Sequence, residues 1–88
     1  MTPLRLRLGN TIRRLREARG VSQEAFAHKA KVHRTTMSEI ERGLSNISVD
    51  IAERIALALD VSLSDLFLEV EAGQASSASR SARTKGRP

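Results

Sequence analysis

The sequence predicts a small all-α domain followed by a disordered tail. Apolar residues recur at helical spacing along most of the 88-residue chain, and no segment alternates in the way a strand does. Apolar residues next to helix-capping residues divide this pattern into five helices. After Glu71 the segment AGQASSASRSARTKGRP has no large apolar residue and cannot bury surface. We therefore assign residues 1–71 to one domain and residues 72–88 to a disordered basic tail.

The first helix is expected to have Thr2 as its cap and Pro3 in its first turn. Apolar residues then follow at helical spacing, and Gly20 is a natural stop. These apolar residues are Leu4, Leu8, Ile12 and Leu15.

The other four helix starts are predicted by one repeated pattern. An apolar residue precedes a capping residue, and a second apolar residue follows at the spacing of a hydrophobic staple. The four instances are Val21-Ser22 with Phe26, Val32-His33 with Met37, Ile47-Ser48 with Ala52, and Val61-Ser62 with Leu66. The three serines are good caps and the histidine is a poor one. The helices should therefore begin near Gln23, Arg34, Val49 and Leu63.

Helices of this length are unstable alone in water, so they must pack on one another. Gly43 is a good end for the third helix, whereas Asp60 tolerates the left-handed backbone at the end of the fourth without favouring it. The expected core consists of Leu8, Ile12, Leu15, Phe26, Ala27, Val32, Met37, Ile40, Ile51, Ile55, Leu59, Leu63, Leu66 and Phe67.

The composition excludes several functions. Cysteine is absent, which excludes disulfides, cysteine metal sites and thiol catalysis. Phe26 and Phe67 are the only aromatic residues, which disfavours a single-strand binder that stacks bases on exposed rings. His28 and His33 lack acidic partners at a metal-ligand spacing, and we interpret both as surface residues. The sequence thus predicts a protein that is not an enzyme and needs no metal or cofactor.

The apolar segments also bear on the compartment. None approaches the about 20 residues that a membrane span needs. No apolar region follows the N-terminal arginines as it does in a signal peptide. We therefore expect a cytoplasmic protein without membrane contact.

The net charge of +5 is unevenly distributed. Residues 1–20 carry +5, residues 21–43 carry +1, residues 44–71 carry −5 and residues 72–88 carry +4. A basic balance favours nucleic acid as a partner, but residues 1–71 carry only +1. If the partner is a nucleic acid, the acidic segment 44–71 should face away from it.

Residues 23–42 have the pattern of a helix-turn-helix, in which the second of two steeply crossing helices is exposed for the major groove. The window QEAFAHKAKVHRTTMSEIERG has apolar or small residues where the helices would face each other, and Ala27 is small where they would cross closely. The remaining positions of the second helix of this motif, which is the third helix of the chain, are polar: Arg34, Thr35, Ser38, Glu39 and Arg42.

This window and its flanks resemble the Cro and phage-repressor (Xre-type) helix-turn-helix family. RRLREARGVSQEAFA is similar to the first two helices of that family, SEIERG to the end of its recognition helix, and ALALDVSLSDLF to its last two helices. The resemblance covers Leu8 to Phe67 and implies a compact five-helix, lambda-repressor-like DNA-binding domain. The short length and the ERGLSNIS segment look most like controller proteins of restriction–modification systems. The sequence departs from the family at Lys31, where Gly is usual, and at His33, where Ser or Thr is usual.

The resemblance implies that the recognition helix reads base edges. Arg34 can form a bidentate contact with guanine, Thr35 can contact thymine, and Glu39 can accept a hydrogen bond from cytosine. Thr36 and Ser38 are further candidates for DNA contacts. The alternative is a solvated helix face without a ligand.

Phosphate contacts are implied on both sides of this helix. Gln23 matches a family residue that binds a phosphate together with a helix N-terminus. Arg42, Ser45 and Asn46 follow the recognition helix and are candidates for backbone contacts, which position a protein without reading sequence.

Two further pairs have expected roles. In the family, residues at the positions of Arg16 and Glu41 form a salt bridge that ties the first helix to the third; two independent solvated charges are the alternative. Leu68 and Val70 should lie partly exposed on the fifth helix, which suggests an isologous dimer contact. A frayed helix end that packs on its own domain is the alternative there.

Together these features predict a homodimer that binds double-stranded DNA at a palindromic operator and regulates transcription, by blocking RNA polymerase or by contacting it. Two alternatives remain open. One is an antitoxin-type regulator that also binds a partner protein. The other is a helix-turn-helix fold that serves only as a protein-interaction module, against which the polar, partly basic recognition helix argues.

Overall fold

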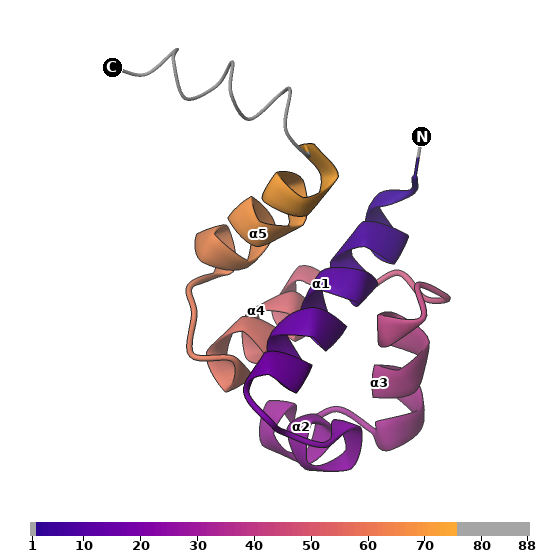
Figure 1. Ribbon diagram of the computed structural model, residues 1–88. Helices are drawn as coiled ribbons and strands as arrows, with labels where there is room; N and C mark the ends of the chain where they lie inside the picture. The colour runs from indigo at the N-terminus through magenta and orange to yellow at the C-terminus, as the bar shows by residue number, and fades with distance from the viewer. Residues whose placement is uncertain (1, 76–88) are drawn as a thin grey trace.

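The computed structural model describes residues 2–75, which form five α-helices and no strand within this range (Figure 1). The helices are α1 (Leu4–Ala18), α2 (Gln23–Ala30), α3 (Arg34–Glu41), α4 (Val49–Ala58) and α5 (Leu63–Ala75). The predicted all-α architecture is confirmed, and α2 to α5 begin at the four predicted positions.

The predicted domain boundary at residue 71 lies too early, because α5 continues to Ala75. Val70, near its end, is buried in the core and anchors it. Each residue added to an anchored helix gains a backbone hydrogen bond, so the helix continues through residues 72–75. The rest of the predicted tail, residues 76–88, lies outside the described residues.

Serine caps fix the starts of three helices. The hydroxyls of Ser22, Ser48 and Ser62 each accept a hydrogen bond from the third amide of the following helix, at 3.1, 3.1 and 3.0 Å. His33 makes no such bond before α3, as expected for histidine, which is a poor capping residue.

The predicted cap of α1 is wrong. Pro3, not Thr2, is the capping residue, with an extended backbone (φ −58°, ψ 147°) and no side-chain cap bond. Its carbonyl accepts hydrogen bonds from the amides of Leu6 and Arg7 at 3.0 and 3.2 Å, so the chain enters the helix one residue later than predicted. Proline suits this position because its ring holds φ in the range that the cap requires.

The first four helices end in the same way. A residue in the left-handed conformation follows each helix, and the next amide bonds back to a carbonyl of the last turn, which is a Schellman motif. The left-handed residues are Gly20, Lys31, Gly43 and Asp60. The back-bonding amides and their acceptors are Val21 to Arg16, Val32 to Ala27, Leu44 to Glu39, and Val61 to Ala56, at 3.3, 2.9, 2.9 and 3.0 Å.

Three valines each belong both to the end of one helix and to the start of the next. Val21, Val32 and Val61 each follow the left-handed residue of one helix and precede the cap of the next. All three pack against the core. Because a single apolar side chain stabilises both the end of one helix and the start of the next, it fixes the direction of the chain at each turn.

The core forms where the five helices meet. Its buried members are Leu8, Ile12, Phe26, Ala27, Ala30, Met37, Ile40, Ile55, Ala56, Ala58, Leu59, Leu66 and Val70. Leu15, Val32, Ile51 and Phe67, which were predicted in the core, are only partly buried against it. Leu63 is 36% exposed, because it begins α5 at the edge of the core.

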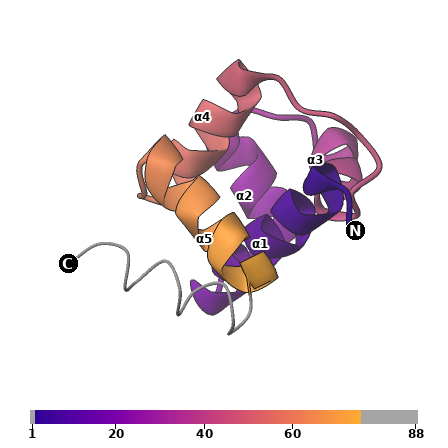
Figure 2. The same cartoon turned by 90° about the horizontal axis from the view of Figure 1, so that it is seen from above.

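α1 lies between α3 and α5 and packs against both, while α2 packs against α3 and α4 (Figure 2). Within the acidic segment 44–71, α5 is separated from α3 by α1, whereas residues 44–48 directly follow α3. The expectation that the whole segment faces away from DNA stays a prediction.

Gly9 sets how closely α1 approaches α3. A Cβ atom at this position would collide with the backbone carbonyl oxygens of Ile40 and Glu41. Only glycine lets the two backbones come this close. The sequence alone does not reveal this role of Gly9, because a glycine inside a helical pattern does not show which neighbour it meets.

Candidate nucleic-acid interface

The helix α3 has a buried face and a polar face. Met37, Ile40 and Glu41 are buried between α3 and the rest of the domain. At about 100° per residue, the opposite face carries the polar residues of the motif. They are Arg34, Thr35, Ser38, Glu39 and Arg42, of which Arg34, Thr35 and Arg42 are exposed. The polar face of α3 is thus exposed to solvent beside the short turn that follows α2.

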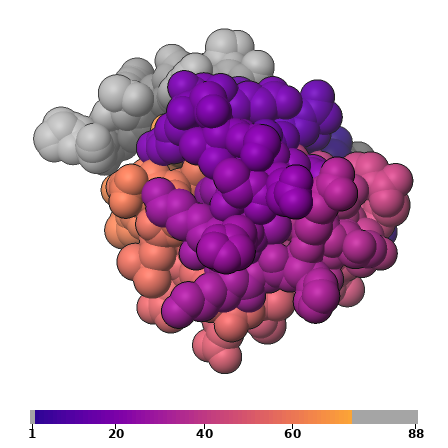
Figure 3. All heavy atoms as spheres, turned by 90° about the horizontal axis from the view of Figure 1, so that it is seen from below, coloured from indigo at the N-terminus to yellow at the C-terminus, as the bar shows by residue number. Residues whose placement is uncertain are grey.

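Five of the predicted contact residues lie around one hollow. It has a volume of about 220 Å³ and lies between the start of α2 and the polar face of α3. Its lining consists of Gln23, Arg34, Thr35, Ser38 and Arg42. Seen from below, α2 and α3 are side by side at the surface (Figure 3). Two arginines and the N-terminus of α2 make this hollow suited to an anion such as a phosphate.

The remaining predicted contact residues lie elsewhere. Thr36 and Glu39 are half-buried on α3, outside the lining of this hollow. Ser45 and Asn46 line a separate, largely apolar hollow beside α1 and α5. The hydroxyl of Ser45 is buried without a hydrogen-bond partner, so the expected contact from this residue to a phosphate needs its main chain rather than its side chain.

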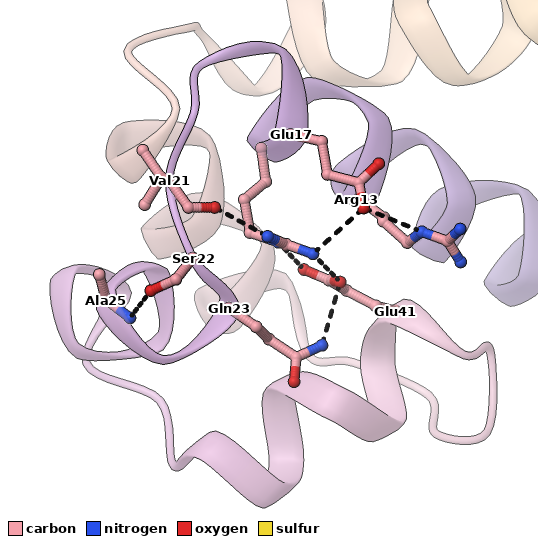
Figure 4. A network of polar contacts seen from close by, with 8 residues as sticks. Arg13, Glu17, Val21, Ser22, Gln23, Ala25 and Glu41 are labelled. Carbon is pink, nitrogen blue, oxygen red and sulfur yellow. Dashed lines mark hydrogen bonds and ion pairs between the residues drawn. The ribbon is translucent and has the colours of Figure 1, made fainter.

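Arg16 of α1 and Glu41 of α3 form a bidentate ion pair (Figure 4). Arg16 Nε donates to Glu41 Oε2 at 2.8 Å, and Nη2 donates to Oε1 at 3.0 Å. The residues are only 8% and 3% exposed. The hydrogen bond to Glu41 raises the pKa of Arg16 above its ordinary value, which outweighs the opposite effect of burial. Because the pKa of Arg16 is raised, the stability that its charged form contributes is fully present below the ordinary pKa of arginine and is lost as the pH rises through the raised value.

A third helix joins this ion pair. Gln23, the first residue of α2, donates from Nε2 to Glu41 Oε1 at 3.1 Å (Figure 4). Arg16 Nη1 also donates to the carbonyl oxygen of Val21 in the α1–α2 turn, at 2.7 Å. The buried carboxylate therefore holds α1, α2 and α3 together directly behind the polar face.

The sequence does not reveal this role of Gln23, because the family resemblance implies a contact of its side chain with a phosphate instead. The hydrogen bond to Glu41 uses one amide N–H, and the residue is only half-buried, so the amide oxygen and the hollow remain accessible. Glu41 occurs eighteen positions later in the chain, and no local sequence pattern pairs two residues at that distance.

Among residues 2–75 there is no group of three potential ligands that could hold a metal ion. Within the same range no helix is both long and apolar enough to cross a membrane.

Comparison with known proteins agrees with this geometry. A family model described as helix-turn-helix matches residues 12–66, and the chain belongs to this family. It is 39% identical over 72 residues to the control protein C.MunI of a Mycoplasma species, covering 81% of this chain and 97% of the relative. It is 42% identical over 64 residues to the control protein C.BamHI of Bacillus amyloliquefaciens, covering 72% and 79%. Among solved structures it is similar to the restriction-modification controller protein C.AhdI of Aeromonas hydrophila, with 34% identity, a TM-score of 0.68, and coverage of 70% and 94%.

Proposed function

We propose that the protein is a sequence-specific regulator of transcription that binds double-stranded DNA as a homodimer at a palindromic operator. Membership of the helix-turn-helix family and the control-protein relatives support the coarser part of this function, DNA binding in the service of transcription. The observation that best supports contact with DNA at this surface is the hollow between α2 and α3, where five polar residues, two of them arginines, lie beside an exposed helix face.

In this proposal α3 enters the major groove. Arg34 and Thr35 lie exposed in its first turn and face base edges, where Arg recognises guanine and Thr recognises thymine. Glu39, one turn later, accepts a hydrogen bond from cytosine. Ser38 and Thr36, on the same helix, make further contacts with the DNA.

Phosphate contacts hold the helix in register without reading sequence. Gln23 and Arg42 border the hollow from its two sides and contact the DNA backbone together with the amides at the start of α2. Asn46 and the main chain of Ser45 contact the strand beyond the end of α3.

Of the two residues predicted to form the dimer contact, only Leu68 is exposed, and the prediction for Val70 is wrong. Val70 is 1% exposed and belongs to the core, because it follows Leu66 by one helical turn and shares its inward face. Leu68 is 58% exposed and remains available. Leu63, five residues earlier on the same helix, lies about 140° around the helix from Leu68 and does not extend this surface. We propose that an isologous contact through Leu68 places two copies of α3 roughly 34 Å apart, one turn of DNA.

The similarity to restriction-modification controllers favours an operator beside such genes. Selection of bound sequences from a random duplex library tests the whole proposal. We expect a palindrome whose half-sites lie about 10 base pairs apart, bound by a species with twice the monomer mass in light scattering. A protein without sequence preference at low salt, or one that binds a single half-site as a monomer, contradicts the proposal.

A further inference from the structure

A third hollow, of about 270 Å³, lies where the end of α2 meets the end of α4. Three cationic residues border it, and Leu57 lies among them. We call this surface the α2–α4 patch; it consists of Lys29, Ala30, Lys31, Arg54, Leu57 and Ala58. It shares no residue with the hollow that borders the polar face of α3. The proposed DNA contacts therefore leave its function open.

The backbone at Lys31 gives the first reason to look for a ligand here. Lys31 has φ 60° and ψ 46°, the left-handed conformation that favours glycine. Glycine occupies the same position after α1 and α3, at Gly20 and Gly43, and Asp60 occupies it after α4, where aspartate tolerates this conformation better than lysine does. A lysine held in a conformation that costs stability is evidence for a function of its side chain.

The chemistry of the patch gives the second reason. Lys29, Lys31 and Arg54 are exposed, and no carboxylate within residues 2–75 forms an ion pair with any of them. Leu57 is 66% exposed among these charges, above the buried Ala30 and Ala58. The patch therefore presents three cationic side chains, without an ion-pair partner among residues 2–75, around an accessible apolar side chain.

We propose that the α2–α4 patch binds an acidic segment of a partner protein. Lys29, Lys31 and Arg54 pair with the carboxylates of that segment, and Leu57 contacts an apolar side chain that it carries. A DNA backbone offers phosphates but nothing that would bury Leu57. A second copy of this chain is also unsuitable, because an isologous contact would bring these cations close to their own counterparts.

The test uses the full chain labelled with ¹⁵N and a synthetic helical peptide with leucines flanked by glutamates. We expect chemical-shift changes in the amides of the α2–α4 patch. Replacing the leucines of the peptide by serine, or Leu57→Ser in the protein, should weaken binding about fivefold, since either change removes the apolar contact. Lys31→Gly should weaken binding about threefold, the size of one exposed ion pair.

Matched controls keep this test decisive. Leu44→Ser alters a leucine that is 62% exposed outside the patch, and it should leave the affinity unchanged. Lys31→Gly should raise the melting temperature, so its loss of binding cannot come from unfolding. Equal affinities for Leu57→Ser and the parent, or shifts outside the patch, overturn the proposal. So does a duplex of random sequence that shifts the same amides with an affinity that depends on Lys31 but not on Leu57. The titration with peptide contains no DNA, so its failure leaves the proposed DNA binding untouched.

Discussion

The guanidinium group of Arg16 holds the carboxylate of Glu41 through two hydrogen bonds, of 2.8 and 3.0 Å, across the contact between α1 and α3. Gln23 adds a third hydrogen bond to the same carboxylate from the start of α2. The polar face of α3 is therefore positioned by an ion pair that lies behind it. Loss of either charged partner would leave the other buried and uncompensated.

Glu41→Ala should destabilise the domain by about 3 kcal/mol, because it leaves the Arg16 guanidinium buried without its partner. Glu39→Ala, on the polar face of the same helix, should change stability by less than about 0.5 kcal/mol. Thermal unfolding monitored by circular dichroism at neutral pH measures both. Equal melting temperatures for the two variants would refute a structural role for the ion pair.

Gly9→Ala should destabilise the domain although alanine is the better helix former. The added methyl group meets the backbone oxygens of Ile40 and Glu41, which cannot move without separating α1 from α3. Gly73→Ala is the matched control, since nothing lies within 4 Å of a Cβ atom there. It should stabilise α5 by about 0.5–1 kcal/mol. Urea titration of both variants would give opposite signs, and a stabilised Gly9→Ala protein would show that the helices are not in close contact.

Lys31→Gly should stabilise the domain by about 1 kcal/mol, because glycine adopts the left-handed backbone without strain. Lys29→Gly, two residues earlier inside α2, should destabilise it by a similar amount. A comparison of the two unfolding midpoints separates the effect of the turn from the loss of a surface charge. If both variants are destabilised, Lys31 is not strained in solution.

A chain ending at Ala75 should bind random duplex DNA with a weaker salt dependence than the full chain. Residues 76–88 carry four cationic residues and no acidic one. If all four contact phosphates, the slope of log K against log salt should fall by about 3 to 4. Preference for the operator over random DNA should be retained, since these residues lie outside the proposed base contacts. An unchanged slope would show that the segment does not contact phosphates.

Local sequence patterns predicted the helix boundaries well, and the reason is physical. The staples and caps act between residues a few positions apart, so Ser22, Ser48 and Ser62 determine helix starts that can be identified without the rest of the fold. The left-handed backbone at Lys31 and Asp60, which follows α2 and α4, likewise depends on residues that are close in the sequence.

Features that depend on packing could not be obtained in this way. Whether Val70 is buried depends on where α5 lies relative to α1, and the sequence pattern near the end of a helix leaves this open. The hydroxyl of Ser45 is enclosed by residues from several elements. The contacts of Gly9 and Gln23 with α3 likewise join segments that are distant in the sequence. The family resemblance predicted the ion pair between Arg16 and Glu41, but it did not predict the hydrogen bond from Gln23 to Glu41.

Fluorescence anisotropy with Arg34→Ala addresses sequence readout by α3 most directly. The selected palindrome and a scrambled duplex of the same length are compared at one fixed salt concentration. We expect the variant to lose about 1–3 kcal/mol on the palindrome, the size of a bidentate contact to guanine, and much less on the scrambled duplex. Equal losses on the two duplexes would show that Arg34 contacts only the backbone, and would contradict base readout by this residue.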